Sequence, residues 1–380
     1  QPLPTDFHAY KLNLDALKKI LAGAPHEGRP GVRPIVFVPL PDGTYTPVSV
    51  EVSPVLGPVL AAQYPSLQTF TFDGVEDTKI SGRMTLAGDS FQAILRPPDH
   101  FARITPLTTS EGTFHLTFLN RNRTDGALDF RNHDDPRDPQ HDDPPPPAIA
   151  AVTPVTSDKV VSVQGGASFG IQALQTGDTL RVFRMAASTT GEYYQAMVGP
   201  NGALDVVAAI VAEVNNANLG FETEFAVRMQ LDWAVLYTDP TMDPFSTINP
   251  PGVTVCNTRN ENVAAISTPT GPLDPSNYDI GFAFSQGGGN GCAWYVVCTA
   301  TKEQGAGLFN TALTPGSSTG LILHEMAHQL GAKHTFSSTT GSCGNPGEFN
   351  QPSAFEPGSG STISSYFNAC APNDVDVTNG

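Results

Sequence analysis

The residues best suited to chemistry lie together in the segment LILHEMAHQLGAKHTF, residues 321–336. His324 and His328 are four positions apart, so on an α-helix they project from one face and can share a metal ion. Glu325 follows the first histidine, where it can reach a water molecule and act as a general base. This spacing predicts a metal-dependent hydrolytic site on a helix.

The residues after this pair extend the predicted site. Gly331 allows the chain to leave the helix with a positive φ, so that His334 can return as a third ligand. Three neutral imidazoles leave one coordination position open, which is typical of a catalytic zinc site. Of the nine histidines, these three are the ones found after residue 141. We therefore predict one catalytic Zn²⁺ rather than a helix with buried core histidines.

The helix that carries the motif has to be held in a core. Leu323, Met326, Ala327 and Leu330 supply an apolar stripe for this purpose. Strand-like and helical segments alternate after residue 150, which favours an α/β (α+β) fold with a mixed, mostly parallel twisted sheet. The expected strands are residues 179–187, 225–231, 278–284 and 292–298, and the expected helix is residues 204–216.

The first 130 residues have a different pattern. A short helix is expected at residues 13–22, with Asn13 as its N-cap. Alternating polar and apolar residues predict strands at 35–40, 44–52, 79–86, 90–95 and 113–118. We interpret residues 1–130 as a small β-rich domain, and no pattern within it indicates catalysis.

The two parts are joined by a segment rich in Pro and Asp. Residues 131–150 include the run RNHDDPRDPQHDDPPPP, which has no apolar residue to bury, so we expect an extended linker. The second domain then spans residues 151–380.

Charge and composition narrow the possible partners. Twenty basic and 37 acidic residues give a net charge of −17, which argues against nucleic acid and anionic membranes as partners. No apolar run approaches the roughly 18 residues of a membrane span. All five cysteines lie in the last third of the chain, and the first residue is Gln1 rather than Met. We expect a secreted, extracellular protein with disulfide bonds.

The extended motif His-Glu-x-x-His-x-x-Gly-x-x-His resembles that of the metzincin zinc endopeptidases, especially the reprolysin-like and pappalysin-like bacterial secreted members. The similarity covers roughly residues 175–370 and includes residues 184–193, 237–240, 277–281 and 355–361. It implies a metzincin catalytic domain that hydrolyses peptide bonds in protein or peptide substrates by a zinc-activated water, with Glu325 as general base. It also implies that the N-terminal domain is propeptide-like and covers the cleft of a zymogen before processing.

The resemblance implies further site residues. Gly291, Ala293 and Trp294 resemble the edge strand that holds substrate by antiparallel pairing. Tyr366 corresponds to a catalytic tyrosine that lies near the zinc and can hydrogen-bond the tetrahedral intermediate. The chain departs from the family at Ser364, which replaces the turn methionine, and at Thr335, where animal reprolysins have Asp.

Cys343 and Cys370 flank the loop between the third ligand and the Tyr366 turn, so a bridge between them would hold both near the cleft. The other three cysteines then allow one pair and one free thiol. Ca²⁺ could bind near residues 345–350 or at the acidic C-terminus. Two alternatives to a peptidase stay open: a catalytically impaired binding or scaffold protein that keeps the zinc site, and a zinc hydrolase of a non-peptide amide.

Overall fold

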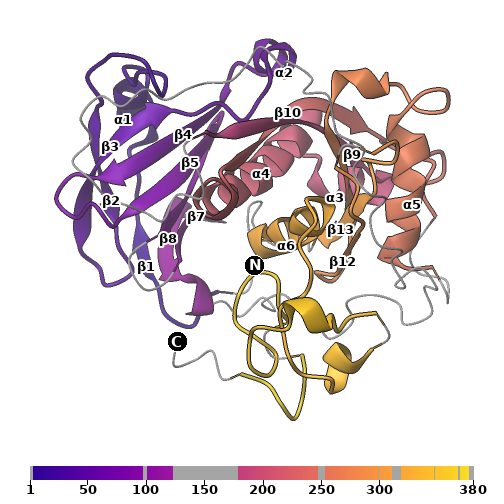
Figure 1. Cartoon of the computed structure of the whole chain (residues 1–380). Helices are drawn as coiled ribbons and strands as arrows, with labels where there is room; N and C mark the ends of the chain where they lie inside the picture. Colours follow the sequence, from indigo (N-terminus) through magenta and orange to yellow (C-terminus); the bar gives the residue numbers. More distant parts are fainter. Residues whose placement is uncertain are drawn as a thin grey trace.

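The computed structural model describes residues 3–96, 101–122, 179–246, 253–297, 299–309, 318–345, 347–366 and 369–375. These residues form two β-sheets with helices packed between and around them (Figure 1). The linker predicted at residues 131–150 lies outside the described residues, as does Cys298.

The N-terminal part is an eight-stranded antiparallel sheet in the order β1-β8-β7-β6-β5-β4-β3-β2. The sheet curls so that β8 and β2, far apart in the strand order, come together: the Thr117 hydroxyl on β8 donates to the Pro39 carbonyl on β2 at 3.2 Å. The elements are β1 His8–Tyr10, α1 Leu14–Leu21, β2 Ile35–Pro39, β3 Tyr45–Val52, α2 Pro58–Gln63, β4 Leu67–Gly74, β5 Ser81–Ala87, β6 Ser90–Arg96, β7 Ala102–Thr109, β8 Gly112–Leu119 and the 3-10 turn η1 Asn120–Asn122.

Local chemistry explains why the N-terminal elements begin and end where they do. Asn13 caps α1, because its side-chain oxygen accepts a hydrogen bond from the Ala16 N–H at 3.0 Å. Between β2 and β3, the Asp42 carboxylate accepts from the Thr44 N–H at 2.9 Å, and Gly43 adopts a φ of 84°. The predicted helix and hairpin are therefore confirmed, whereas β1, β4 and β7 were not predicted.

The second sheet has five strands in the order β10-β9-β11-β13-β12. The first four are parallel, and β12 pairs antiparallel with β13 at one edge. This confirms the mixed, mostly parallel sheet. The elements are β9 Arg181–Thr189, α3 Gly191–Met197, α4 Ala203–Phe225, β10 Val227–Leu236, α5 Val255–Ile266, η3 Pro275–Asn277, β11 Ile280–Gln286, β12 Gly291–Ala293, β13 Gly305–Phe309, α6 Thr319–Gln329, η4 Gly341–Gly344 and η5 Gln351–Ser353.

Two predicted boundaries in this part were wrong. The helix expected at residues 204–216 continues to Phe225, so β10 begins only at Val227. The strand expected at residues 292–298 is limited to β12, because the N–H groups of Val296 and Val297 turn to the Gln329 carbonyl at 3.2 and 3.1 Å. In both cases a contact distant in sequence sets the boundary.

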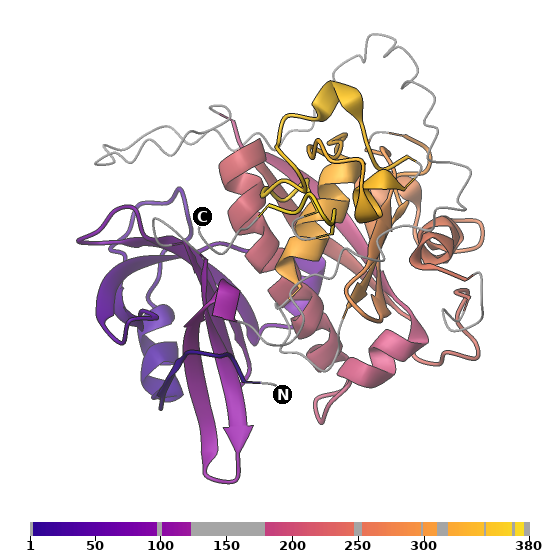
Figure 2. The ribbon, with the colours of Figure 1, turned by 90° about the horizontal axis from the view of Figure 1, so that it is seen from below.

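Helix α4 lies between the two sheets (Figure 2). One apolar cluster contains Val55, Leu56 and Leu60 of the N-terminal part together with α4, β10, β11 and α6 residues such as Ile210 and Phe282. The Leu231 N–H also donates to the Val55 carbonyl at 2.7 Å, so residues near 56 extend the edge formed by β10. The N-terminal part thus shares a core with the part that carries the histidines. Among the described helices, none is long and apolar enough to cross a membrane.

Candidate metal centre and catalytic site

Helix α6 is fixed against α4 at its start and along its length. Leu321, Ile322 and Met326 are fully buried in the shared apolar cluster. At the N-terminus of α6, the Ser318 N–H donates to the Glu213 carboxylate of α4 at 3.1 Å. A negative charge at a helix N-terminus is stabilising, so this contact holds the helix start in place.

The chain leaves α6 as the sequence predicts. Gly331 has a φ of 104°, a conformation that few other residues adopt without strain. The Ala332 N–H donates to the Ala327 carbonyl at 2.9 Å, which closes the C-terminal turn. The following residues therefore fold back along the helix, and His334 comes to lie beside the two helical histidines.

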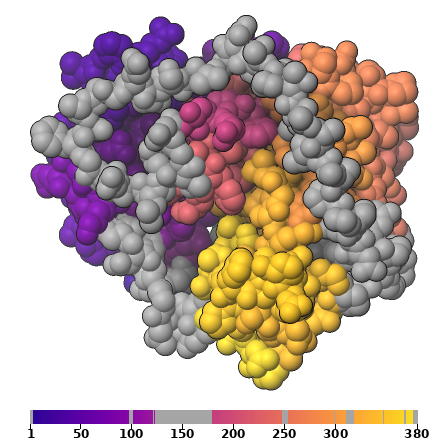
Figure 3. Space-filling view, viewed as in Figure 1, coloured from indigo at the N-terminus to yellow at the C-terminus, as the bar shows by residue number. Residues whose placement is uncertain are grey.

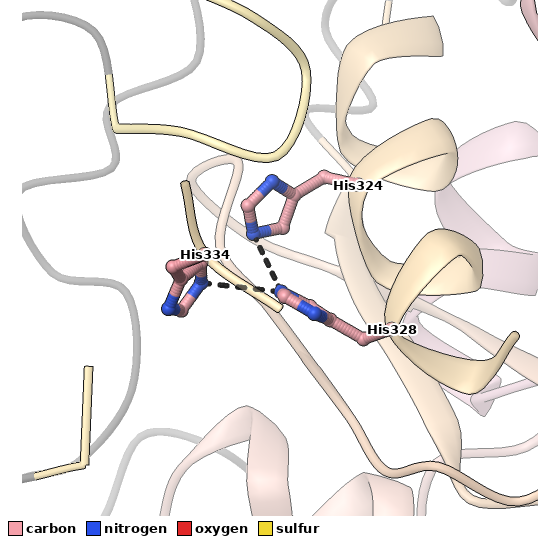
Figure 4. A group of neighbouring side chains, drawn as sticks. All are labelled: His324, His328 and His334. Carbon is pink, nitrogen blue, oxygen red and sulfur yellow. Dashed lines mark hydrogen bonds between the residues drawn. The ribbon is translucent and has the colours of Figure 1, made fainter. Parts of the chain in front are cut away.

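The three histidines converge on a single point (Figure 4). The Nε2 atom of His328 lies 3.0 Å from Nε2 of His324 and 3.1 Å from Nε2 of His334. Two nitrogens bound to one tetrahedral zinc at 2.0–2.1 Å are about 3.3 Å apart. His324 and His334 are buried and His328 is half-buried. The spacing is that of three ligands to one small cation.

The opposite ring nitrogens show which tautomer each imidazole adopts when it is neutral. Each Nδ1 lies against a backbone carbonyl: His324 at 2.6 Å from Ile363, His328 at 2.8 Å from Ala332 and His334 at 2.9 Å from Glu348. A carbonyl only accepts hydrogen bonds, so each neutral ring carries its proton on Nδ1. The three Nε2 lone pairs then face one another, which suits a divalent cation between them.

Glu325 is fully buried one residue after the first histidine. It lies directly against Gly291 of β12, because a Cβ atom at position 291 would be 2.3 Å from the Glu325 carboxylate. The glycine thus permits the carboxylate and the edge strand to approach closely. The structure places two predicted site residues, Glu325 and Gly291, in contact.

The other expected substrate residues lie along and just beyond β12. Ala293 and Trp294 are half-buried, and the Arg259 guanidinium of α5 lies 4.9 Å above the Trp294 ring. A disulfide joins Cys256 of α5 to Cys292 of β12. Helix α5 therefore supports the edge strand, a role that the sequence pattern did not reveal.

Tyr366 lies beside the histidines and is fully buried. Its ring centroid is 4.6 Å from that of His334 and 4.8 Å from that of Phe336. Its hydroxyl donates to the Glu348 carboxylate, on the Nδ1 side of His334. The expectation that this hydroxyl hydrogen-bonds the tetrahedral intermediate stays a prediction, since here the hydroxyl donates to Glu348.

The turn at residues 361–366 supports the site through its backbone. The Ile363 carbonyl accepts from His324, and the Ser364 carbonyl accepts from the Thr335 N–H at 3.0 Å. The Ser364 side chain is half-buried, whereas the Tyr366 ring is fully buried beside the rings of His324 and His334. The Thr335 hydroxyl donates a hydrogen bond to the Glu356 carboxylate, which gives a structural role to the threonine that follows the third histidine.

Residues after α6 form a lobe that holds this turn. In Figure 3 they appear in yellow beside the gold residues of α6. The predicted disulfide between Cys343 and Cys370 is present, and both cysteines pack with Phe336 and Tyr366 in one small core. The bridge therefore joins the two ends of the segment that supports His334.

Within the described residues, the three histidines are the one group of at least three His, Cys, Asp or Glu side chains arranged to hold a metal ion. The described residues include no second group of this kind, so the expected calcium site is not supported. The histidines and the adjacent Glu325 define a metal-dependent hydrolase, and the family comparison narrows the class. Residues 207–335 match the model of the reprolysin-like metallopeptidase family M12B.

This match and the histidine cluster support a zinc-dependent peptidase, and the predicted similarity to reprolysin-like metzincins is confirmed. Among solved structures, the chain is similar to metalloproteinase-II from Bacteroides fragilis, with 9% sequence identity and a TM-score of 0.43. That alignment covers 84% of this chain and 85% of the other. No curated protein matches the chain.

Sequence reasoning missed several residues of the site. Glu348 appeared in the sequence only as an acidic residue in a Gly/Pro-rich loop, and Ile363 contributes a carbonyl that no side-chain pattern encodes. Arg259 of α5 contacts the Trp294 ring, and the Gln329 carbonyl of α6 accepts hydrogen bonds from Val296 and Val297 just beyond β12. No local spacing signals any of these contacts.

Proposed function

We propose that this protein is a secreted zinc-dependent endopeptidase in which Glu325 is the general base. The observation that carries the proposal is the convergence of three Nε2 atoms whose rings are fixed through Nδ1, next to a buried glutamate. A site built only for stability needs no such base. The two disulfides suit an oxidising compartment, which supports secretion.

His324, His328 and His334 would hold the zinc ion. Bound there, zinc supplies Lewis-acid chemistry: it polarises the scissile carbonyl and lowers the pKa of water toward about 7. Glu325 accepts the proton of the attacking water and later transfers it to the leaving amine. The burial of Glu325 keeps bulk water away from that proton. Gly291 has no side chain and therefore leaves room for the carboxylate at this position.

The edge strand β12 indicates which class of substrate the protein binds. An antiparallel edge strand presents backbone groups to an extended peptide, so the peptide adds to the sheet as a further strand. We propose that Gly291, Ala293 and Trp294 bind substrate in this way. An extended polypeptide segment satisfies this geometry, which favours a protein or peptide substrate over a small amide.

Cleavage of unfolded casein with and without a chelator tests the function. We expect chelator-sensitive cleavage that returns when zinc is added, and no cleavage by Glu325→Gln. Zinc binding without cleavage of any peptide would instead support a scaffold protein. Turnover of small amides without casein cleavage would indicate a hydrolase of non-peptide substrates.

A further inference from the structure

Glu348 lies behind the third histidine, in the loop between η4 and η5. It is buried, with an exposed fraction of 1%. Its backbone carbonyl is 2.9 Å from Nδ1 of His334, and its carboxylate Oε2 is 3.4 Å from the same atom. The Tyr366 hydroxyl donates to that Oε2 atom. One residue therefore contacts the ring of His334 through both its backbone and its side chain.

A carboxylate at this place acts on the metal site in two ways. It fixes the orientation and the tautomer of the imidazole, since Nδ1–H is held toward the Glu348 oxygens. It also places a negative charge behind the ring, which makes Nε2 more basic and a better ligand for a cation. Burial makes both effects stronger, because little water screens the charge.

We propose that Glu348 is a positioning residue for the third metal ligand, His334, and that Tyr366 acts through Glu348. The inference rests on the proposed zinc site. Tyr366 holds the carboxylate by its hydroxyl and holds the His334 ring by edge-to-face packing, with centroids 4.6 Å apart. The lobe closed by the Cys343–Cys370 disulfide thereby determines the orientation of one ligand.

The same lobe offers a matched control in Glu356. Its carboxylate accepts hydrogen bonds from the N–H groups of Ser361 and Thr362, at 2.6 and 2.9 Å, and from the hydroxyls of Thr335 and Thr362. These bonds hold the turn together and involve none of the three histidines. A purely structural role for Glu348 would therefore predict similar effects of E348Q and E356Q.

The test compares the metal affinity of E348Q and E356Q with that of the wild type. Zinc affinity is measured by competition with a chromogenic chelator, and ligand geometry by the visible spectrum of the Co²⁺ form. We expect E348Q to lower zinc affinity about 10–100-fold and to shift the Co²⁺ bands. E356Q leaves the contacts between Glu348 and His334 in place, so its loss of zinc affinity should be clearly smaller than that of E348Q, with an unchanged spectrum. Y366F should weaken binding in the same direction as E348Q, but less.

Equal zinc affinity of E348Q and wild type overturns the inference, as does an equal loss in E356Q. If E348Q fails to fold, Y366F decides: wild-type affinity in that variant contradicts the inference, and a weakened affinity supports it. These readouts need no peptide substrate. A wild-type protein that binds zinc but cleaves no peptide would refute the proposed function and leave the role of Glu348 intact.

Discussion

At the metal centre, the position of one proton on each imidazole decides what the cluster can bind. With Nδ1–H donated to a carbonyl, Nε2 is left as a lone pair, and three such lone pairs within 4.8 Å of one another favour a cation. Protonation of Nε2 would place positive charges side by side instead. The backbone carbonyls of Ile363, Ala332 and Glu348 thus orient the three rings for metal binding, and they do so without a bound metal ion.

Variants of Glu325 and His334 should distinguish the loss of catalysis from the loss of metal binding. Glu325→Gln keeps all three ligands, so zinc content should stay near one per chain while peptide hydrolysis falls by several orders of magnitude. His334→Ala removes a ligand, so both zinc content and hydrolysis should fall. Metal analysis and a peptide assay of the purified variants check this. Unchanged zinc and turnover in His334→Ala would exclude it as a ligand.

Gly291 should be required for activity although it carries no side chain. In Gly291→Ala the new Cβ would lie 2.3 Å from the Glu325 carboxylate, so the base must move. We expect kcat to fall at least tenfold with zinc content unchanged. Gly288→Ala is the control, since no atom lies within 4 Å of its Cβ position and this glycine is exposed. Equal activity of the two variants would show that Glu325 tolerates the displacement.

The residues that follow α6 have little regular structure, yet they supply all three carbonyls that fix the histidines. A segment of this kind holds its shape through cross-links and capped turns rather than through a long ladder of backbone bonds. Here the cross-links are the Cys343–Cys370 disulfide and the Glu356 carboxylate. Burial raises the pKa of Glu356, but the bonds from Ser361, Thr335 and Thr362 outweigh it and lower this pKa.

Removal of the two disulfides should have different functional effects. Replacement of Cys343 and Cys370 by serine opens a loop of 27 positions and should cost about 3–4 kcal/mol of stability. Loss of the Cys256–Cys292 bridge, with a separation of 36, should cost a similar amount. Only the first double variant should also lose zinc affinity, because only that loop contacts His334. Denaturant unfolding and zinc titration of both variants check this prediction.

On the scale of the whole molecule, the N-terminal sheet and the metal-binding part are joined by a network of buried charges. Arg83 of β5 donates to Asn215 at 3.0 Å and pairs with Glu222, both on α4. Arg228 of β10 pairs with Glu222 and with Glu27 of the N-terminal part. These contacts attach the N-terminal sheet to α4 and β10, and covering of the cleft by that sheet stays a prediction.

Arg83 should contribute strongly to stability because its exposed fraction is only 1%. In Arg83→Met the buried Ser53 and Asn215 and the half-buried Glu222 lose a donor, so we expect a loss of about 3–5 kcal/mol. Arg96→Met is the control at the same junction, where an exposed pair with Glu224 at 3.7 Å should contribute less than about 1 kcal/mol. Denaturant unfolding measures both, and equal losses would contradict this account of the junction.

Glu222 should make stability depend on pH. Burial raises the pKa of Glu222, but the charges of Arg83 and Arg228 outweigh it and hold this pKa below its ordinary value of 4.5. A pKa lowered by folding adds stability that is complete above about pH 4.5 and is lost as the pH falls through the folded-state value. The Tm difference between wild type and Glu222→Gln should therefore shrink in acid.

The sequence by itself determined the chemistry of the ligands and the class of the fold. The spacing of His324, Glu325, His328, Gly331 and His334 depends on one helical turn and one positive φ, which are local properties of the chain. Alternating strands and helices likewise indicated a mostly parallel sheet. These predictions succeeded because each rests on contacts between residues close in sequence.

Only the tertiary structure decided which distant residues complete the site and where the elements end. Helix α4 continues past the expected residue 216, because Asn215 and Asn218 find partners in Met84 and Met229. Glu348 reaches His334 from a loop without periodicity, and Gly291 of strand β12 reaches Glu325 of helix α6. Polar residues inside a helix and acids in a loop favour no single local structure. Their roles depend on partners that folding brings together from far along the chain.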